Sequence, residues 1–298
     1  MKTYPIPTGI MCFLLATNAP SAIAQTVAAD EATSIGSFQR AASFCIDAAG
    51  VIFVLDRATS ELLKFSTGGK LVNRIGGFGW SSGAFDQPLD VACPNGLDVY
   101  VADYGNHRIQ RFDRNLSFIS SLYLRDSEDP EERFGYPRSV ALSRFGSLFI
   151  IDGENTRVVK VNTLDQVERV FGGVDAGKGR LQNPSRIRIS SADFVYVQDR
   201  NDIVVFDTFG NYLRTLGDGL FDKIRSFTIA RDTLVIIDSL KVRLFDENGD
   251  EKTVHELSGE EVRPPSAAID IAVHGDKLFV LSMTKIIVLK LQYEERVR

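Results

Sequence analysis

The stretch that decides the fold is Asp98-Val99-Tyr100-Val101-Ala102-Asp103-Tyr104-Gly105-Asn106-His107-Arg108-Ile109, because its β-rich run recurs along the chain. Runs of this kind, rich in β-branched and aromatic residues, are typical of buried strands. Six of them end at Asp56, Asp103, Asp152, Asp199, Asp238 and Ser282, at intervals of 47, 49, 47, 39 and 44 residues. Three positions before these ends stand Phe53, Tyr100, Phe149, Tyr196, Val235 and Phe279. One large residue at the same place in six copies indicates a repeat protein.

Each repeat contains more than the central strand. A strand introduced by proline, as at Pro88, precedes the run, and a third strand such as Arg108–Phe112 follows it. A turn with Gly or Asn then leads into a fourth strand that ends in an apolar residue plus glycine, as at Ile75-Gly76. Four antiparallel strands in each of six units predict an all-β, six-bladed β-propeller, which limits exposed sheet edges by closing in a circle.

The sixth unit is incomplete at the C-terminal side. Its third strand at Ile286–Leu291 leaves only seven residues, too few for a turn and a fourth strand. The segment Ile35-Gly36-Ser37-Phe38 echoes Ile75-Gly76-Gly77-Phe78 of the first unit. We therefore expect residues 26–35 to supply the outer strand of the last blade and to close the ring.

The repeat resembles the NHL family. Asp103–Ile109 and Asp152–Val158 both match the pattern D-x-x-N-x-R-[IV] at the heart of the NHL repeat, and Phe85–Pro88 and Leu181–Pro184 resemble its apolar-x-x-Pro strand start. The resemblance covers residues 25–298 and implies a single six-bladed propeller domain. It implies no particular activity, because propellers host many functions.

The N-terminus reads as a secretory signal peptide over residues 1–24. A charged start is followed by the apolar core Ile10–Ala16, and Ala22-Ile23-Ala24 suits cleavage before Gln25. We therefore expect an exported protein of the periplasm or the extracellular space. No other stretch reaches the roughly 18 apolar residues that a membrane span needs.

Composition narrows the function classes. Hydrophobic residues make up 44% and charged residues 24%, as in ordinary globular chains, which excludes disorder and collagen. The net charge of −5 gives no overall positive field, so we expect no nucleic-acid partner. We expect the chain to be monomeric by itself.

One position of the inner strands, 13 residues before the end of the central run, holds Ser43, Asp90, Ser139, Arg186 and Arg225. Arg186 and Arg225 would either clamp a carboxylate or phosphate at one mouth of the channel, or pair with Asp90 or neighbouring acids and only close it. Asp90 and Asp270 are weak candidates for a divalent cation, which prefers six or more oxygen ligands. His107, His255 and His274 occupy different repeat positions and are not expected to converge.

The irregular loops between blades offer the best binding candidates. Trp80 lies on one of them beside Phe78, and either anchors a partner or covers the gap between blades. Arg57, Tyr104 and Arg200 each follow the end residue of a central run and should project on the same face. Binding usually sits on loops that a rigid scaffold presents.

Cys45 and Cys93 fall 11 and 10 residues before the ends of their central runs. An oxidising compartment permits a Cys45–Cys93 disulfide between adjacent blades. The one-residue offset favours two buried thiols instead, if it points the side chains to opposite faces of their strands.

No catalytic constellation appears in the sequence. We therefore expect a non-enzymatic propeller without a cofactor, which binds a protein, peptide or glycan as a recognition or scaffold subunit. The alternative is a metal-dependent hydrolase or lyase, similar to propeller lactonases, with its site at the central channel and a divalent cation as its cofactor.

Overall fold

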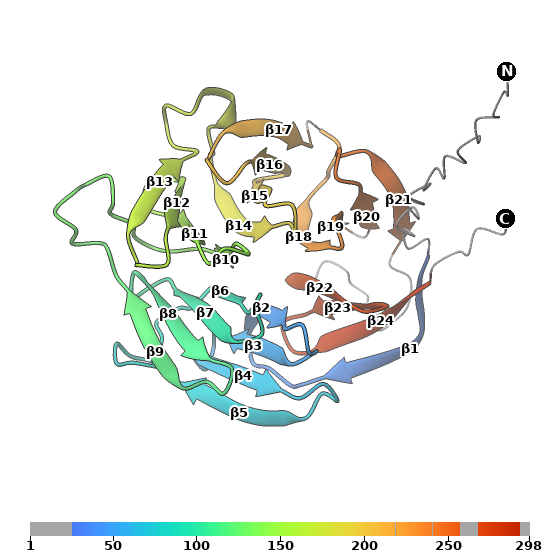
Figure 1. The fold of residues 1–298 in the computed structure, drawn as a ribbon. Coiled ribbons are helices and arrows are strands. Elements are labelled where there is room, and N and C mark those ends of the chain that lie inside the picture. The colour runs from blue at the N-terminus through green and yellow to red at the C-terminus, as the bar shows by residue number, and fades with distance from the viewer. Residues whose placement is uncertain (1–25, 218, 240, 257–267, 293–298) are drawn as a thin grey trace, which may run out of the picture.

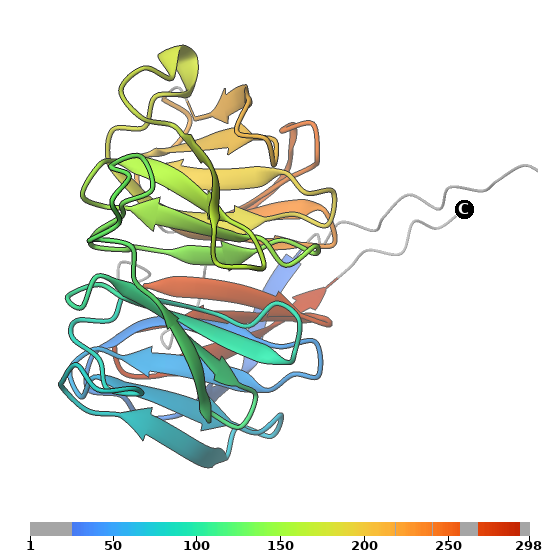
Figure 2. The same ribbon diagram turned by 60° about the vertical axis from the view of Figure 1, so that its left-hand side comes forward.

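In the computed structural model, residues 26–217, 219–239, 241–256 and 268–292 are described. These residues form six four-stranded antiparallel sheets arranged around a central axis (Figure 1). The prediction of an all-β propeller with six blades is confirmed. Outside the strands, one 3-10 helix, Gly177–Gly179, sits in a loop that projects at the top of Figure 2.

Each sheet follows the chain from the inner to the outer strand. The blades consist of, first, β2 (Ala41–Ile46), β3 (Ile52–Asp56), β4 (Glu61–Phe65) and β5 (Leu71–Gly76); second, β6 (Asp90–Ala92), β7 (Asp98–Asp103), β8 (Arg108–Asp113) and β9 (Phe118–Leu122); third, β10 (Val140–Leu142), β11 (Leu148–Asp152), β12 (Arg157–Val161) and β13 (Val167–Phe171); fourth, β14 (Pro184–Ile189), β15 (Val195–Asp199), β16 (Asp202–Phe206) and β17 (Tyr212–Leu216); fifth, β18 (Ile224–Ala230), β19 (Thr233–Asp238), β20 (Lys241–Phe245) and β21 (Glu251–Glu256); sixth, β22 (Asp270–His274), β23 (Lys277–Leu281) and β24 (Ile286–Gln292) with β1 (Thr26–Ile35).

The N-terminal strand belongs to the sixth sheet. β1 pairs antiparallel with β24, from Thr26 opposite Gln292 to Ile35 opposite Ile286, with an irregularity between Ala28 and Thr33. The chain then crosses to the first blade, and the Phe38 amide donates to the carbonyl of Thr284. How much this pairing contributes to keeping the ring closed stays a prediction.

The hydrophobic core lies between the blades. One cluster of buried side chains fills each of the six interfaces between neighbouring sheets. Phe53 packs toward the second blade and the next residue, Val54, toward the sixth. At the same positions of the second blade, Tyr100 faces the third blade and Val101 the first. Equivalent residues thus face the same way around the ring. The large residues three positions before the repeat ends are all buried, as the repeat predicts.

The D-x-x-N-x-R-[IV] pattern fastens the loop that enters the second and the third blade. Asp103 Oδ1 accepts from the amide of Asp86 at 2.8 Å, and Asp103 Oδ2 accepts from Asn106 Nδ2 and Arg108 Nε, both at 2.8 Å. Arg108 also donates to the carbonyls of three loop residues, Trp80, Ser81 and Ala84. Asp152 binds its asparagine and arginine in the same way in the third blade. The motif therefore has a structural role in these two blades, and it fixes loops on one face of the ring.

We call this the linking face, and the opposite one the hairpin face. The linking face carries the segments 77–89, 123–139 and 172–183 between successive sheets, whereas the hairpin face carries the turns after the inner and third strands. The linking face is therefore the side with the longest irregular segments that the structure describes.

Candidate functional site

A ring of polar side chains surrounds the central axis at the linking end of the inner strands. Each blade contributes one residue, opposite the residue before the end of its central run: Ser43, Asp90, Ser139, Arg186, Ser226 and Asp270. Five of the six are almost completely buried, and the side chain of Arg186 is 12% exposed. This polar ring forms the floor of the site.

Asp90 connects the first four blades. Its carboxylate accepts from Ser43 Oγ at 2.6 Å, from the Ser139 hydroxyl, and from Arg188 Nη1 at 3.2 Å. Burial by itself raises the pKa of Asp90, but Arg188 and Arg186 together with the two hydroxyls outweigh it and hold the pKa below its ordinary value of 3.8. Asp90 is therefore ionised inside the ring.

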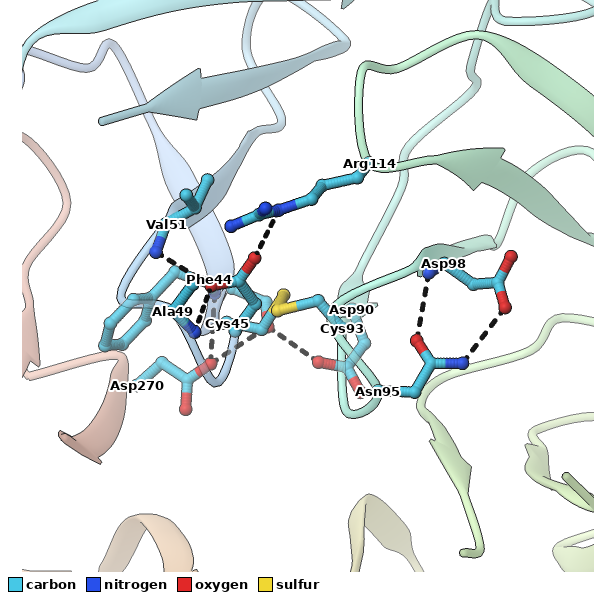
Figure 3. Close-up of a disulfide and its surroundings, with 12 residues drawn as sticks. Phe44, Cys45, Ala49, Val51, Asp90, Cys93, Asn95, Asp98, Arg114 and Asp270 are labelled. Atoms are coloured by element: carbon cyan, nitrogen blue, oxygen red, sulfur yellow. Dashed lines mark hydrogen bonds and ion pairs between the residues drawn. A yellow bond between two sulfur atoms is a disulfide. The ribbon is translucent and has the colours of Figure 1, made fainter. Parts of the chain in front are cut away.

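Asp270 likewise connects neighbouring blades on the other side of the ring. Its carboxylate pairs with Arg186 and accepts from Ser226 Oγ and Ser43 Oγ, both at 2.9 Å. Figure 3 shows Asp90 and Asp270 on either side of the strand that carries Phe44 and Cys45. Arg186 and Arg188 are thus neutralised by two aspartates, which is the channel-closing alternative of the sequence analysis.

The arginine pair differs from the predicted one. Arg225 was expected at the ring position of the fifth blade, but Ser226 lies opposite Ile237 and takes the place. The irregularity at the start of β18 also occurs in β2 and β14, so it does not set the fifth blade apart. What differs is the turn that follows: Ile229 pairs with Leu234 across four residues, whereas Ile46 pairs with Ile52 across five. The shorter turn moves every residue of β18 by one position relative to its partner strand. The second arginine at the channel is Arg188, from the same strand as Arg186.

Above the polar ring, the linking face opens into a pocket of about 430 Å³. It is lined by Arg57, Gln87, Leu89, Asp90, Tyr104, Arg138, Ser185 and Arg186. Arg57, Tyr104 and Arg186, singled out in three different repeats, meet here; that they bind a partner stays a prediction. We call it the channel-mouth pocket.

Arg138 lines this pocket but was not among the predicted site residues. It directly follows Pro137, and the residues after the corresponding prolines, Leu89 and Ser185, also line the pocket. A comparison of the repeats at the position after proline would have found it. Its Nη1 donates to Asn183 Oδ1 at 2.6 Å and to the carbonyl of Pro184 at 3.1 Å.

The other candidates do not line the channel-mouth pocket. Trp80 and Phe78 are 63% and 79% exposed, on the loop that Arg108 fastens to the second blade. Arg200 is exposed, and Arg225 is half-buried at the register shift of β18. Trp80 therefore does not fill the gap between blades and presents its indole on the surface.

The metal candidates are engaged in other contacts. Ser hydroxyls, backbone amides and arginines occupy the carboxylates of Asp90 and Asp270. Within the described ranges, no three His, Cys, Asp or Glu residues come together as a metal site would require. His107, His255 and His274 belong to the second, fifth and sixth blades.

The cysteine expectation was wrong in its preferred form, because a disulfide joins Cys45 to Cys93 with their Cα atoms 5.9 Å apart (Figure 3). Successive residues of a strand point alternately to the next blade and to the previous blade. Two residues that meet across an interface must therefore stand at repeat positions that differ by an odd number of residues. The one-residue offset therefore turns the two cysteines toward each other.

In the part of the chain that the structure covers, no helix is long and apolar enough to cross a membrane.

Comparison with known proteins supports the repeat assignment. The family model of the NHL repeat matches residues 85–112. The protein named brain tumor of Drosophila melanogaster is 28% identical over 148 residues, and the B-box type zinc finger protein ncl-1 of Caenorhabditis elegans is 30% identical over 144 residues. These matches span 48% and 47% of this chain but only 14% and 16% of the two relatives.

Solved structures show likeness of fold. A streptogramin B lyase structure has a TM-score of 0.63 at 10% identity and covers 88% of this chain and 97% of its own. A catalytically inactive variant of virginiamycin B lyase from Staphylococcus aureus, solved with quinupristin, has a TM-score of 0.64 at 11% identity and covers 88% of this chain and 99% of its own. At such identity the likeness concerns the fold alone.

Proposed function

We propose that this chain, an NHL-repeat β-propeller of six blades, is a binding module that recognises a protein, peptide or glycan through its linking face, as a recognition or scaffold subunit. The observation that carries the proposal is the channel-mouth pocket, where residues from four blades converge on the face with the longest loops. Rigid scaffolds with irregular loops commonly bind partners in this way.

The exposed aromatic residues of the same face support the proposal. Trp80 and Phe78 stand on a loop whose backbone is held by Arg108, so a partner that covers them would order little additional chain. Aromatic side chains of this kind often dominate binding energy. Export remains part of the proposal, because it rests on the signal-peptide pattern of residues 1–24, which lie outside the described residues.

The test is retention of partners from an extract of the cells that make the protein, using the immobilised full chain as bait. We expect the double variant Trp80→Ala, Phe78→Ala to retain the specific partner at least about tenfold less, as for loss of an interface hot spot. The matched control is Phe145→Ala, Leu164→Ala, because both residues are more than 70% exposed but lie on the hairpin face. Equal loss in both double variants, or in neither, would contradict the proposal.

A second candidate function is a hydrolase or lyase with its site at the channel mouth, optionally metal-dependent. It is favoured by the likeness of fold to streptogramin B lyase over 88% of the chain. Tyr104 and Arg138 would then be the groups placed to touch a substrate in the pocket. A metal assay of the purified protein separates the metal-dependent form of this candidate from the binding module.

A further inference from the structure

We propose that the channel-mouth pocket binds a single carboxylate of a peptide partner, with Arg57 and Arg138 as the ligating residues. The proposal rests on the function proposed above and specifies the chemistry of its partner. These two arginines belong to the first and third blades, and the carboxylates of the polar ring do not neutralise their positive charge.

The first argument is the balance of charge around the pocket. Arg186 pairs with Asp270, and Arg188 with Asp90, so the polar ring together with Arg188 is neutral. Arg57 instead donates only to the neutral side chain of Gln87, at 2.7 Å, and Arg138 only to Asn183 and Pro184. Among the described residues, no carboxylate forms an ion pair with Arg57 or Arg138. Two positive charges therefore face the pocket without a counter-ion.

Ten of the twenty arginines that the structure describes have such a counter-ion, Arg186 and Arg188 among them. Ion pairs hold arginines of both faces: Arg74, Arg108, Arg111, Arg114, Arg125, Arg144, Arg157 and Arg243. Of those twenty, four half-buried arginines form no ion pair, namely Arg57, Arg138, Arg214 and Arg225, and of these only Arg57 and Arg138 line the channel-mouth pocket. A planar guanidinium matches the two oxygens of a carboxylate, and such charge-assisted bonds are about twice as strong as neutral ones.

A glycine makes room for Arg138. The position after the end of the central run carries Arg57 in the first blade and Tyr104 in the second, but Gly153 in the third. A Cβ atom at Gly153 would lie 3.0 Å from Arg138 Nε, 3.1 Å from its Cγ and 2.5 Å from the carbonyl of Tyr136. The absence of a side chain at this position therefore lets Arg138 lie across the turn.

The remaining lining suits a carboxylate on a short side chain or a chain end. The ring of Tyr104 lies against that of Tyr136, with centroids 5.1 Å apart, and Leu89 adds an apolar wall. A volume of about 430 Å³ is at the small end of ligand pockets and admits one side chain with its flanking backbone.

The surroundings favour one isolated anion over a polyanion such as a nucleic acid. The linking segment 123–139 carries five acids on the same face: Asp126, Glu128, Asp129, Glu131 and Glu132. A chain of phosphates that enters the pocket would pass these carboxylates, and the molecule as a whole has a net charge of −5. The buried carboxylate of Asp90 in the floor also disfavours a second negative charge on the ligand.

The test is a nuclear magnetic resonance titration of the full chain that follows the Nε–H signals of its arginines. The probes are N-acetyl-glutamate N-methylamide, its neutral glutamine counterpart, and inorganic phosphate. We expect the glutamate probe to shift the signals of Arg57 and Arg138 saturably, and the glutamine probe to leave them in place. Arg57→Gln and Arg138→Gln should each weaken binding of the glutamate probe about tenfold, the effect of losing one charge-assisted bond.

The matched control is Arg200→Gln, an exposed arginine that lies outside the pocket and should leave the affinity unchanged. Gly153→Ala should weaken binding through displacement of Arg138 and of the Tyr136 carbonyl, with the signals of the other blades intact. Binding of the glutamine probe, tighter binding of phosphate than of glutamate, or equal loss in Arg200→Gln would each overturn the proposal.

The titration tests the carboxylate pocket and the retention assay tests the proposed function, so each proposal can be rejected without the other. If Arg57→Gln, Arg138→Gln retains a partner that Trp80→Ala, Phe78→Ala loses, and the glutamate probe does not bind, the carboxylate pocket is wrong and the binding face stands. If the probe binds but the linking-face variants retain every partner, the pocket stands and the proposed function is wrong.

Discussion

Asp90 is the residue on which most of the channel depends, because its carboxylate contacts groups of three other blades. Ser43, Ser139 and Arg188 all donate to it. The carboxylate is buried, and a buried charge is tolerated only when it is paired and hydrogen-bonded. The neighbouring arginines lower its pKa, so ionised Asp90 stabilises the folded ring at neutral pH.

We predict that Asp90→Asn lowers the free energy of unfolding by about 3 kcal/mol at neutral pH, because it leaves Arg188 with a weaker counter-ion. Since the folded pKa of Asp90 lies below 3.8, its stabilisation is present above that pH and is lost as the pH falls below it. Denaturant unfolding should therefore show the gap between wild type and variant closing from about pH 4 toward about pH 2. The exposed-loop variant Asp126→Asn is the control; a gap that stays constant to low pH would contradict this role.

At the scale of elements, the disulfide joins the inner strand of the first blade to the segment after β6 of the second. It closes a loop with a sequence separation of 48 residues. In the same interface, Arg114 of the second blade pairs with the buried Asp47 of the first at 2.8 Å. These contacts link two blades beyond their shared hydrophobic cluster.

We predict that reduction of Cys45–Cys93 lowers stability by about 2 to 4 kcal/mol, since a cross-link of this span restricts the unfolded chain. The thermal midpoint should fall by about 5 °C or more on treatment with a reductant. The variant Cys45→Ala, Cys93→Ala should melt like the reduced protein and not respond to reductant. Two free thiols counted in the denatured, unreduced protein would refute the prediction.

The N-terminal strand gives a second prediction at this scale. β1 supplies the outer edge of the sixth sheet, although it lies at the other end of the sequence from β24. Removing β1 exposes the edge of β24 and removes the backbone pairing at the six positions where the two strands face each other. A chain that starts at Ser37 should melt about 5 °C or more below a chain that starts at Gln25, at roughly 1 kcal/mol per hydrogen bond. Equal midpoints would show that β1 does not hold the ring together.

At the scale of the whole molecule, the two candidate functions differ in their need for a metal. We predict that protein purified without chelators contains less than stoichiometric divalent metal, and that EDTA leaves its thermal midpoint unchanged. The physical reason is that the buried carboxylates of the channel already have serine, amide and arginine partners. One tightly bound ion per chain, with a midpoint lowered by EDTA, would instead favour the metal-dependent enzyme.

The sequence by itself determined the architecture of this protein. Six copies of one strand pattern at intervals of 39 to 49 residues specify six blades, because each blade must bury the same large residue against its neighbour. The repeat also singled out Arg57, Tyr104, Asp90 and Arg186, which line one pocket because equivalent positions of the repeat lie at equivalent places around the axis. Local patterns are sufficient here because, within every blade and apart from β1, each strand pairs with the next one along the chain.

Only the tertiary structure decided which of these residues work together. The shorter turn between β18 and β19 places Ser226 instead of Arg225 in the polar ring, and the alternating direction of successive strand residues brings Cys45 and Cys93 together. The charge state of the site, with Arg186 and Arg188 compensated and Arg57 and Arg138 not, depends on contacts between residues up to 98 positions apart. Such contacts arise when the ring closes, and no single repeat contains the information for them.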